Sequence, residues 1–139
     1  MKRSRNKDFD PNASDLNHKA YKSGCKEYNR GHFKQAAKAF TESLDYWPED
    51  PQAWFALGNC YDELNKPAKA EKCFRESLQY TSPNHQSDVF YNLGNSLLDQ
   101  AKFEEAIECY GKVSAQSSGY RAAQINMERA QDENPNKNS

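Results

Sequence analysis

Apolar residues recur along the chain at helical spacings of three and four, and the whole pattern repeats about every 34 residues. Residues 54–61 read Trp-Phe-Ala-Leu-Gly-Asn-Cys-Tyr, residues 90–97 repeat this spacing, and residues 20–24 carry a weaker copy. A small residue and an aromatic one follow each copy, four positions apart: Ala36 and Phe40, Ala70 and Phe74, Ala106 and Tyr110. This period predicts a stacked array of helix pairs, because one pair alone cannot bury its apolar face.

Proline and glycine mark the expected helix boundaries. Asp50 precedes Pro51 as a cap before a first-turn proline, and Pro67 begins a second helix in the same way. Gly31 separates the two helices of the first repeat, and Ser14-Asp15 offers a cap for the first helix. The predicted organisation is a flexible basic and polar lead (1–13), a repeat domain (14–131) with repeats 17–50, 51–84 and 87–120 and a capping helix 120–131, and a disordered polar tail (132–139).

The repeated residues resemble those of the tetratricopeptide repeat (TPR) family over roughly residues 17–131. The matching positions are Trp54, Leu57, Gly58, Tyr61, Ala70 and Phe74 in repeat two, and Phe90, Leu93, Gly94, Leu97, Ala106 and Tyr110 in repeat three. Repeat one departs, with Ala20, Ser23 and Glu27 where Trp, Leu and Tyr are usual. The resemblance implies an all-α fold, a right-handed α-solenoid of three helix-turn-helix repeats plus a capping helix. It also implies a protein that binds other proteins.

Composition narrows the function classes further. Nineteen basic and twenty acidic residues give a net charge of -1, which creates no bulk field for nucleic acid. The apolar runs are only a few residues long, whereas a helix needs about 20 to span a bilayer, so we expect no membrane span. The basic residues 1–7 lead into Asp8-Phe9-Asp10 without an apolar stretch, unlike a secretory signal. We therefore expect a cytoplasmic protein.

Catalysis finds little support in the sequence. The three histidines, His18, His32 and His85, are far apart, and no phosphate-binding glycine loop or H-E-x-x-H motif is present. The four cysteines, Cys25, Cys60, Cys73 and Cys109, form no C-x-x-C pair, and we expect them to be small packed thiols in a reducing compartment. We therefore expect no enzyme, no catalytic residue, no metal and no cofactor.

In TPR arrays the first helix of each repeat lines a concave groove. Transferred to this chain, the groove side chains are Tyr21, Lys22 and Tyr28 in repeat one, Phe55, Asn59, Asp62 and Glu63 in repeat two, and Asp88, Tyr91, Asn92, Asn95 and Asp99 in repeat three. The aromatic rings offer rigid contact area, and the amides can hold the backbone of an extended peptide. Four carboxylates against one lysine give a local charge of about -3. We expect a protein segment with basic and apolar residues to bind there.

One TPR subclass holds the acidic tails of heat-shock chaperones with a clamp of lysines, asparagines and an arginine. In register, this chain carries Tyr21, Cys25, Ala56, Asp88 and Asn92 at those positions, so none matches. Asp62 and Asp88 would also repel an acidic tail. The clamp function is therefore disfavoured.

Three other functions stay open on the sequence. The size and repeat number resemble the three-repeat chaperones of type III secretion, which would imply a dedicated client. Self-assembly through the ends of the array is another alternative, although the polar end helices favour a monomer over a weak dimer. The groove face could also be polar only because it is solvated.

Overall fold

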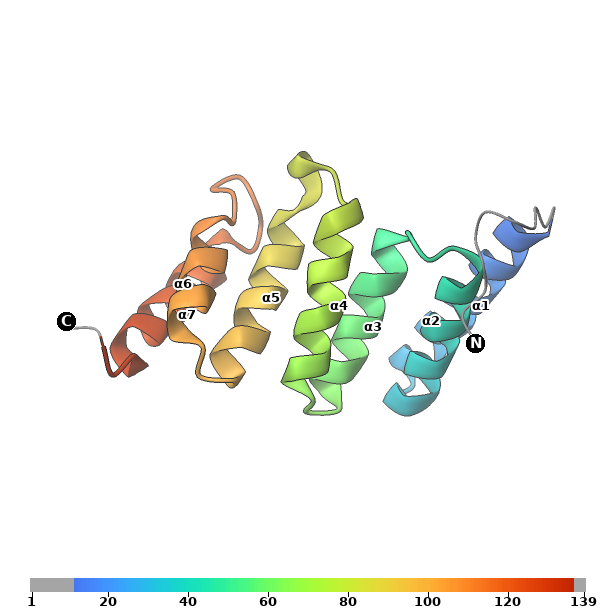
Figure 1. The fold of residues 1–139 in the computed structure, drawn as a ribbon, viewed down its shortest axis with the longest axis horizontal. Coiled ribbons are helices and arrows are strands. Elements are labelled where there is room, and N and C mark those ends of the chain that lie inside the picture. The colour runs from blue at the N-terminus through green and yellow to red at the C-terminus, as the bar shows by residue number, and fades with distance from the viewer. Residues whose placement is uncertain (1–11, 137–139) are drawn as a thin grey trace.

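The computed structural model describes residues 12–136 (Figure 1). Its elements, in order, are α1 (Ala13–Asn29), α2 (Phe33–Tyr46), α3 (Pro51–Glu63), α4 (Pro67–Tyr80), a 3₁₀ turn η1 (Pro83–His85), α5 (Ser87–Asp99), α6 (Phe103–Gly111) and α7 (Tyr120–Glu133). Each pair α1–α2, α3–α4 and α5–α6 packs antiparallel and stacks on the next pair, and α7 packs on α6. The molecule is an α-solenoid of three helical repeats closed by a seventh helix.

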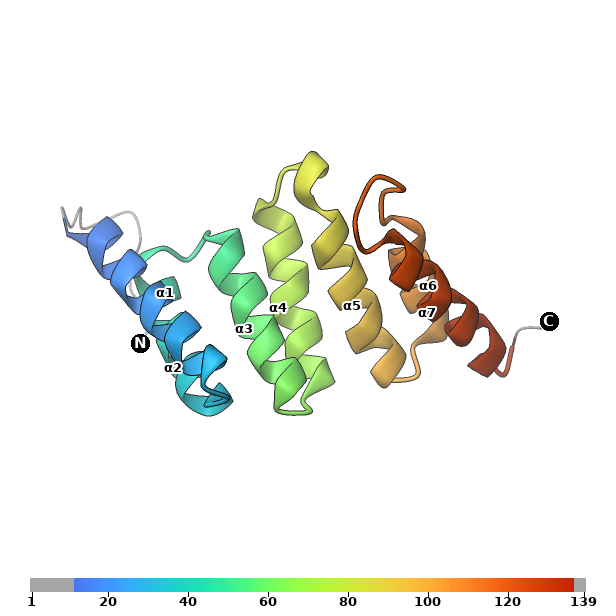
Figure 2. The same ribbon diagram turned by 180° about the vertical axis from the view of Figure 1, so that it is seen from behind.

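The helices form two layers. Figure 1 looks onto α2, α4 and α6, and Figure 2 looks onto α1, α3, α5 and α7 from the opposite side. Within the second set, α3 touches α5 and α5 touches α7. The odd-numbered helices are therefore the inner layer of the array, and the even-numbered helices are the outer layer.

A glycine in each odd-numbered helix makes room for an aromatic ring from the next helix. A Cβ atom built on Gly58 would lie 2.5 Å from Cε1 of Phe74, and the corresponding distances are 2.6 Å for Gly24 to Phe40 and 2.6 Å for Gly94 to Tyr110. The three rings are buried. The repeated Gly and aromatic letters of the sequence are therefore one packing contact, made once per repeat.

The turn between the two helices of each repeat passes through the left-handed backbone region. Gly31, Asn65 and Ala101 have φ values of 79°, 59° and 60°. This conformation is free for glycine and tolerated by asparagine, but it costs alanine about 1 kcal/mol. Gly31 confirms the predicted break in repeat one, whereas the other two repeats make the same turn without glycine.

Two helix boundaries differ from the predicted ones. The first helix begins at Ala13, so Asn12 is its N-cap residue and Ser14-Asp15 lies within the first turn. The last helix runs to Glu133, two residues beyond the predicted capping helix. Asn134 after it is buried, and its side-chain oxygen accepts a hydrogen bond from the Asn136 N–H at 3.0 Å. The predicted lead lies outside the described residues up to residue 11, and the tail from residue 137 does so too.

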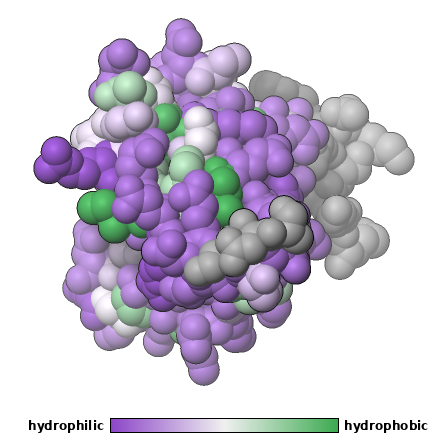
Figure 3. Space-filling model, turned by 90° about the vertical axis from the view of Figure 1, so that its left-hand side faces the viewer, coloured by the Kyte–Doolittle hydropathy of each residue, from purple (hydrophilic) through white to green (hydrophobic). Residues whose placement is uncertain are grey.

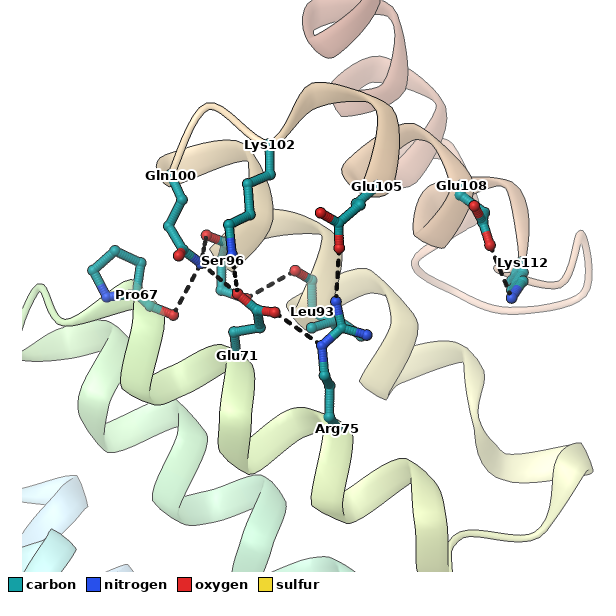
Figure 4. Close-up of polar contacts among 10 residues, drawn as sticks. All are labelled: Pro67, Glu71, Arg75, Leu93, Ser96, Gln100, Lys102, Glu105, Glu108 and Lys112. Atoms are coloured by element: carbon teal, nitrogen blue, oxygen red, sulfur yellow. Dashed lines mark hydrogen bonds and ion pairs between the residues drawn. The ribbon is translucent and has the colours of Figure 1, made fainter.

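A polar network joins repeats two and three on the outer side. The Glu71 carboxylate accepts hydrogen bonds from Arg75 Nε at 2.9 Å, Gln100 Nε2 at 2.9 Å and Lys102 Nζ at 3.1 Å (Figure 4). Arg75 also donates to Glu105 at 3.0 Å. The network thus connects α4 to α6 and to the turn between α5 and α6.

The C-terminal end of the array is mainly hydrophilic, with small separate hydrophobic patches (Figure 3). In α7, Ala123 and Ala130 are buried against the array, while Glu128 and Gln131 are exposed. Glu128 follows Gly94 by 34 residues, so a charged side chain stands where the repeats have the glycine that admits the next helix. The sequence of α7 therefore ends the stack.

Candidate peptide-binding face

Three aromatic side chains of the inner layer stand at equivalent positions, each supported by the buried ring of its own repeat. Tyr21 packs on Phe40, Phe55 on Phe74 and Tyr91 on Tyr110, with centroid distances of 5.4, 5.7 and 6.2 Å and interplanar angles of 55° to 57°. Such tilted contacts suit the ring quadrupoles. Because the buried rings are fixed by the glycines beneath them, the inner aromatic row is held rigid.

The aromatic row borders a concavity of about 930 Å³. Tyr21, Phe55 and Asp88 line it from the inner layer, and Tyr80, Thr81 and Ser117 line it from the end of α4 and the connections between repeats. A volume of this size lies within the range of about 300–1,000 Å³ typical of ligand pockets. The concavity therefore extends from repeat one to the segment before α7.

Asparagine side chains form a second row beside the aromatic one. Asn92 Nδ2 donates to Asn59 Oδ1 at 2.8 Å, and Asn126 Nδ2 donates to Asn95 Oδ1 at 2.9 Å. The Tyr110 hydroxyl also donates to Asn95 Oδ1, at 2.6 Å. These bonds link α3 to α5 and α5 to α7, so the amides are oriented before any partner arrives.

Acidic side chains form a third row at the C-terminal ends of α3 and α5. Burial, then the charges of Asp99 and Glu63, raise the pKa of Asp62 from 3.8 to about 6. Asp62 and Asp99 form no hydrogen bond or ion pair with any other described side chain. Carboxylates are also disfavoured at helix C-termini, where the helix dipole is negative. Arg129, the nearest groove cation along the array, pairs with Glu133 at 2.7 Å.

The structure distributes the predicted groove residues unevenly. Asp88 lies in the first turn of α5, eleven residues before Asp99, or about 16 Å along the helix. There the helix dipole stabilises its charge. The Tyr28 hydroxyl donates to Glu63 at 3.4 Å, and Lys22 is exposed on α1. The predicted cluster of four carboxylates is therefore three carboxylates at one edge and Asp88 at the other.

Two residues of α7 complete the rows, and neither was among the predicted site residues. Ile125, which is 59% exposed, follows Tyr91 by 34 residues and takes the aromatic position of a fourth unit. Asn126 continues the amide row. The repeat spacing was the signal that could have identified Ile125. The hydroxyl-rich connections that line the concavity carry no repeat signal.

Among residues 12–136, no group of three or more His, Cys, Asp or Glu side chains is placed to hold a metal ion. Within the same range, no helix combines the length and apolarity that a bilayer crossing needs. All four cysteines are free thiols, and burial raises the pKa of Cys60 and of Cys73 to about 12.

Comparison with solved structures finds the same architecture in proteins of low sequence identity. The first TPR of Spaghetti (RPAP3), bound to the HSP90 peptide SRMEEVD, matches with a TM-score of 0.79 at 19% identity, covering 86% of this chain and 93% of that one. The TPR2B domain of yeast Sti1 in its complex with pHsp70 matches at 0.78 and 15%, covering 84% and 97%. A chain of a T3SS complex from Aeromonas hydrophila matches at 0.76 and 17%, covering 86% and 83%.

At these identities the likeness concerns the fold. A search of curated protein sequences found no match. The family model for the tetratricopeptide repeat matches residues 21–85 and 91–131, which is more than half of the chain. Proteins of this family and fold are interaction scaffolds and not enzymes. With its three helical repeats and closing helix, the chain belongs to the tetratricopeptide repeat family.

Proposed function

We propose that this protein is an adaptor whose inner face binds a partner segment with basic and apolar residues. The observation that carries the proposal is the pair Asp62 and Asp99, two carboxylates close enough to raise the pKa of Asp62 and without a cation of their own. A lysine or arginine of a partner would supply the missing charge. The rigid aromatic row beside them would take apolar side chains.

Two of the similar structures hold a peptide from a heat-shock chaperone, and one of these peptides, SRMEEVD, is acidic. Their likeness supports peptide binding by the same face. The acidic row would repel such a peptide, and Tyr21 and Asp88 stand where the clamp for acidic tails requires lysines. We therefore propose the opposite charge preference on the same scaffold.

We also propose that the protein is cytoplasmic and monomeric. Four free thiols suit a reducing compartment. The hydrophilic C-terminal end suits a stack that does not continue into a second copy (Figure 3).

A dedicated client chaperone is the second candidate, because a structure from a type III secretion complex shares the fold. Expression in the source cell and purification of the chain separate the two functions. A single stoichiometric partner that is unstable alone would indicate the chaperone, whereas several partners sharing one short motif would indicate the adaptor.

Selection from a random peptide library on the immobilised protein tests the proposal. We expect enrichment of peptides with lysine or arginine beside leucine, isoleucine or phenylalanine. Tyr91→Ala should weaken the selected peptides roughly tenfold, the effect of removing a central aromatic contact. Glu104→Lys, an exposed site on the outer helix α6, is the matched control and should not weaken them. Enrichment of acidic peptides, or binding unchanged by Tyr91→Ala, would overturn the proposal.

A further inference from the structure

We propose that the partner segment binds as an extended strand that crosses the inner helices, with apolar and basic side chains in alternation. This inference rests on the proposed function. Three features carry it: the order of the rows on the inner face, the fixed orientation of the asparagine amides, and the geometry of a strand. Each is a property of the residues described above.

The rows run across the repeats, so each inner helix presents the same order of chemistry along its axis. In α3 that order is Phe55, then Asn59, then Asp62. Seven residues separate the aromatic ring from the carboxylate, or about 10 Å along the helix. A ligand that lies across the helices on the amide row therefore has the aromatic row on one side and the acidic row on the other.

The amide row is a series of alternating donors and acceptors. Asn59 and Asn95 use their oxygens within the protein, and their Nδ2 groups donate to no other described residue. Asn92 and Asn126 use their nitrogens, and their Oδ1 atoms accept from no other described residue. Since all four are partly exposed, the groove presents donor, acceptor, donor and acceptor from α3 to α7.

A strand presents the complementary series along one edge. Its N–H and C=O groups alternate toward the same side at every second residue, as in a sheet ladder. A bound helix would instead keep its backbone groups in its own hydrogen bonds. The four amide groups would then lose water without gaining a partner, which costs affinity. The inner face thus favours a strand over a helix.

Strand geometry then determines the partner's sequence pattern. Side chains alternate on either side of the strand, roughly perpendicular to the backbone hydrogen bonds. One set points toward the aromatic row and the other toward Asp62 and Asp99. The expected motif has apolar residues at i and i+2 and basic residues at i+1 and i+3. In repeat one Cys25 occupies the place of Asn59, so the backbone is held from α3 onward.

Two peptides of identical composition test the pattern by isothermal titration calorimetry on the full chain. The first, acetyl-Ser-Lys-Leu-Arg-Phe-Lys-Leu-Ser-amide, alternates basic and apolar residues. The second, acetyl-Ser-Leu-Lys-Arg-Leu-Phe-Lys-Ser-amide, has helical spacing. We expect the alternating peptide to bind about tenfold more tightly, the effect of one or two net backbone hydrogen bonds. N-methylation at every second backbone nitrogen should weaken it in one phase and spare it in the other.

The outcomes separate this inference from the proposed function. Equal affinities, or no difference between the two N-methylation phases, would overturn the strand and leave an acidic groove for basic and apolar segments. Tighter binding of the helical isomer would overturn the strand in favour of a helix. If neither peptide bound while a library yielded acidic binders, both proposals would be wrong.

Discussion

Repeat two carries two partly buried carboxylates on opposite faces, and their surroundings shift their pKa values in opposite directions. Burial raises the pKa of Glu71 on the outer face, but hydrogen bonds from Arg75, Gln100 and Lys102 outweigh it, so the pKa is lowered overall. On the inner face, burial, Asp99 and Glu63 all raise the pKa of Asp62, to about 6. One carboxylate has its cations within the protein, and the other has only other acids nearby.

The difference distinguishes a structural charge from one available to a partner. The Glu71 side chain is 15% exposed and joins three elements, so its charge contributes to holding repeats two and three together. The Asp62 charge opposes folding, because it is partly desolvated beside like charges at a helix C-terminus. Locally unfavourable charges of this kind cluster at binding sites, where a partner supplies what the protein lacks.

Removing the outer carboxylate should give the largest change in stability. Glu71→Ala leaves Arg75 and Lys102 without their shared acceptor, and we expect the free energy of unfolding to fall by about 1–2 kcal/mol. Urea denaturation followed by circular dichroism measures it. An unchanged midpoint would show that the network in Figure 4 contributes nothing to stability.

Neutralising the inner carboxylate should change stability in the opposite direction. Asp62→Asn keeps the side-chain shape and removes the repulsion from Asp99 and Glu63. Allowing for its partial exposure to solvent, we expect a gain of about 1 kcal/mol at pH 7. The same urea experiment measures it, and a loss of stability would mean that the Asp62 charge is satisfied within the fold.

The pH dependence of the two variants sharpens the comparison. The folded pKa of Asp62 lies above the unfolded value of 3.8, so its penalty is absent below about pH 4 and complete above about pH 6. The gain in Asp62→Asn should therefore disappear between pH 6 and pH 4. The folded pKa of Glu71 lies below 4.5, so its contribution is complete above pH 4.5 and is lost as the pH falls through the folded value. Denaturation series from pH 3 to pH 8 check both windows.

Salt should have the smallest effect. Raising the ionic strength from 0.05 M to 1 M shortens the screening length to about 3 Å and weakens the repulsion at Asp62. The gain in Asp62→Asn should shrink by a few tenths of a kcal/mol. A gain that grows with salt would exclude like-charge repulsion as its cause.

The repeat letters predicted the scaffold because they encode a contact that recurs in every repeat. Gly58 and Phe74 illustrate this: the glycine is needed only because the ring packs directly on it. The left-handed turns at Asn65 and Ala101 were not predicted, because neighbouring helices impose that backbone conformation on residues that do not prefer it.

The groove was predicted less completely than the fold. Repeat register identified Phe55, Asn59 and Asp62 as inner-face residues. It did not reveal that Asn59 and Asn92 bond to each other, since the hydrogen bond depends on the distance between adjacent inner helices. It also grouped Asp88 with the other acids, although the helix length separates them. Proximity between repeats is a three-dimensional property that one repeat's sequence does not contain.

A charge exchange between the groove and its ligand tests the central claim most directly. The protein variant is Asp62→Lys with Asp99→Lys, and the ligands are the alternating basic peptide and its counterpart with glutamate in place of lysine and arginine. Calorimetry on the wild type should show the basic peptide binding at least tenfold more tightly than the acidic one, and the variant, once its helical content is verified, should reverse that order. An order of affinity that stays the same in the variant would contradict recognition of basic segments by the acidic row.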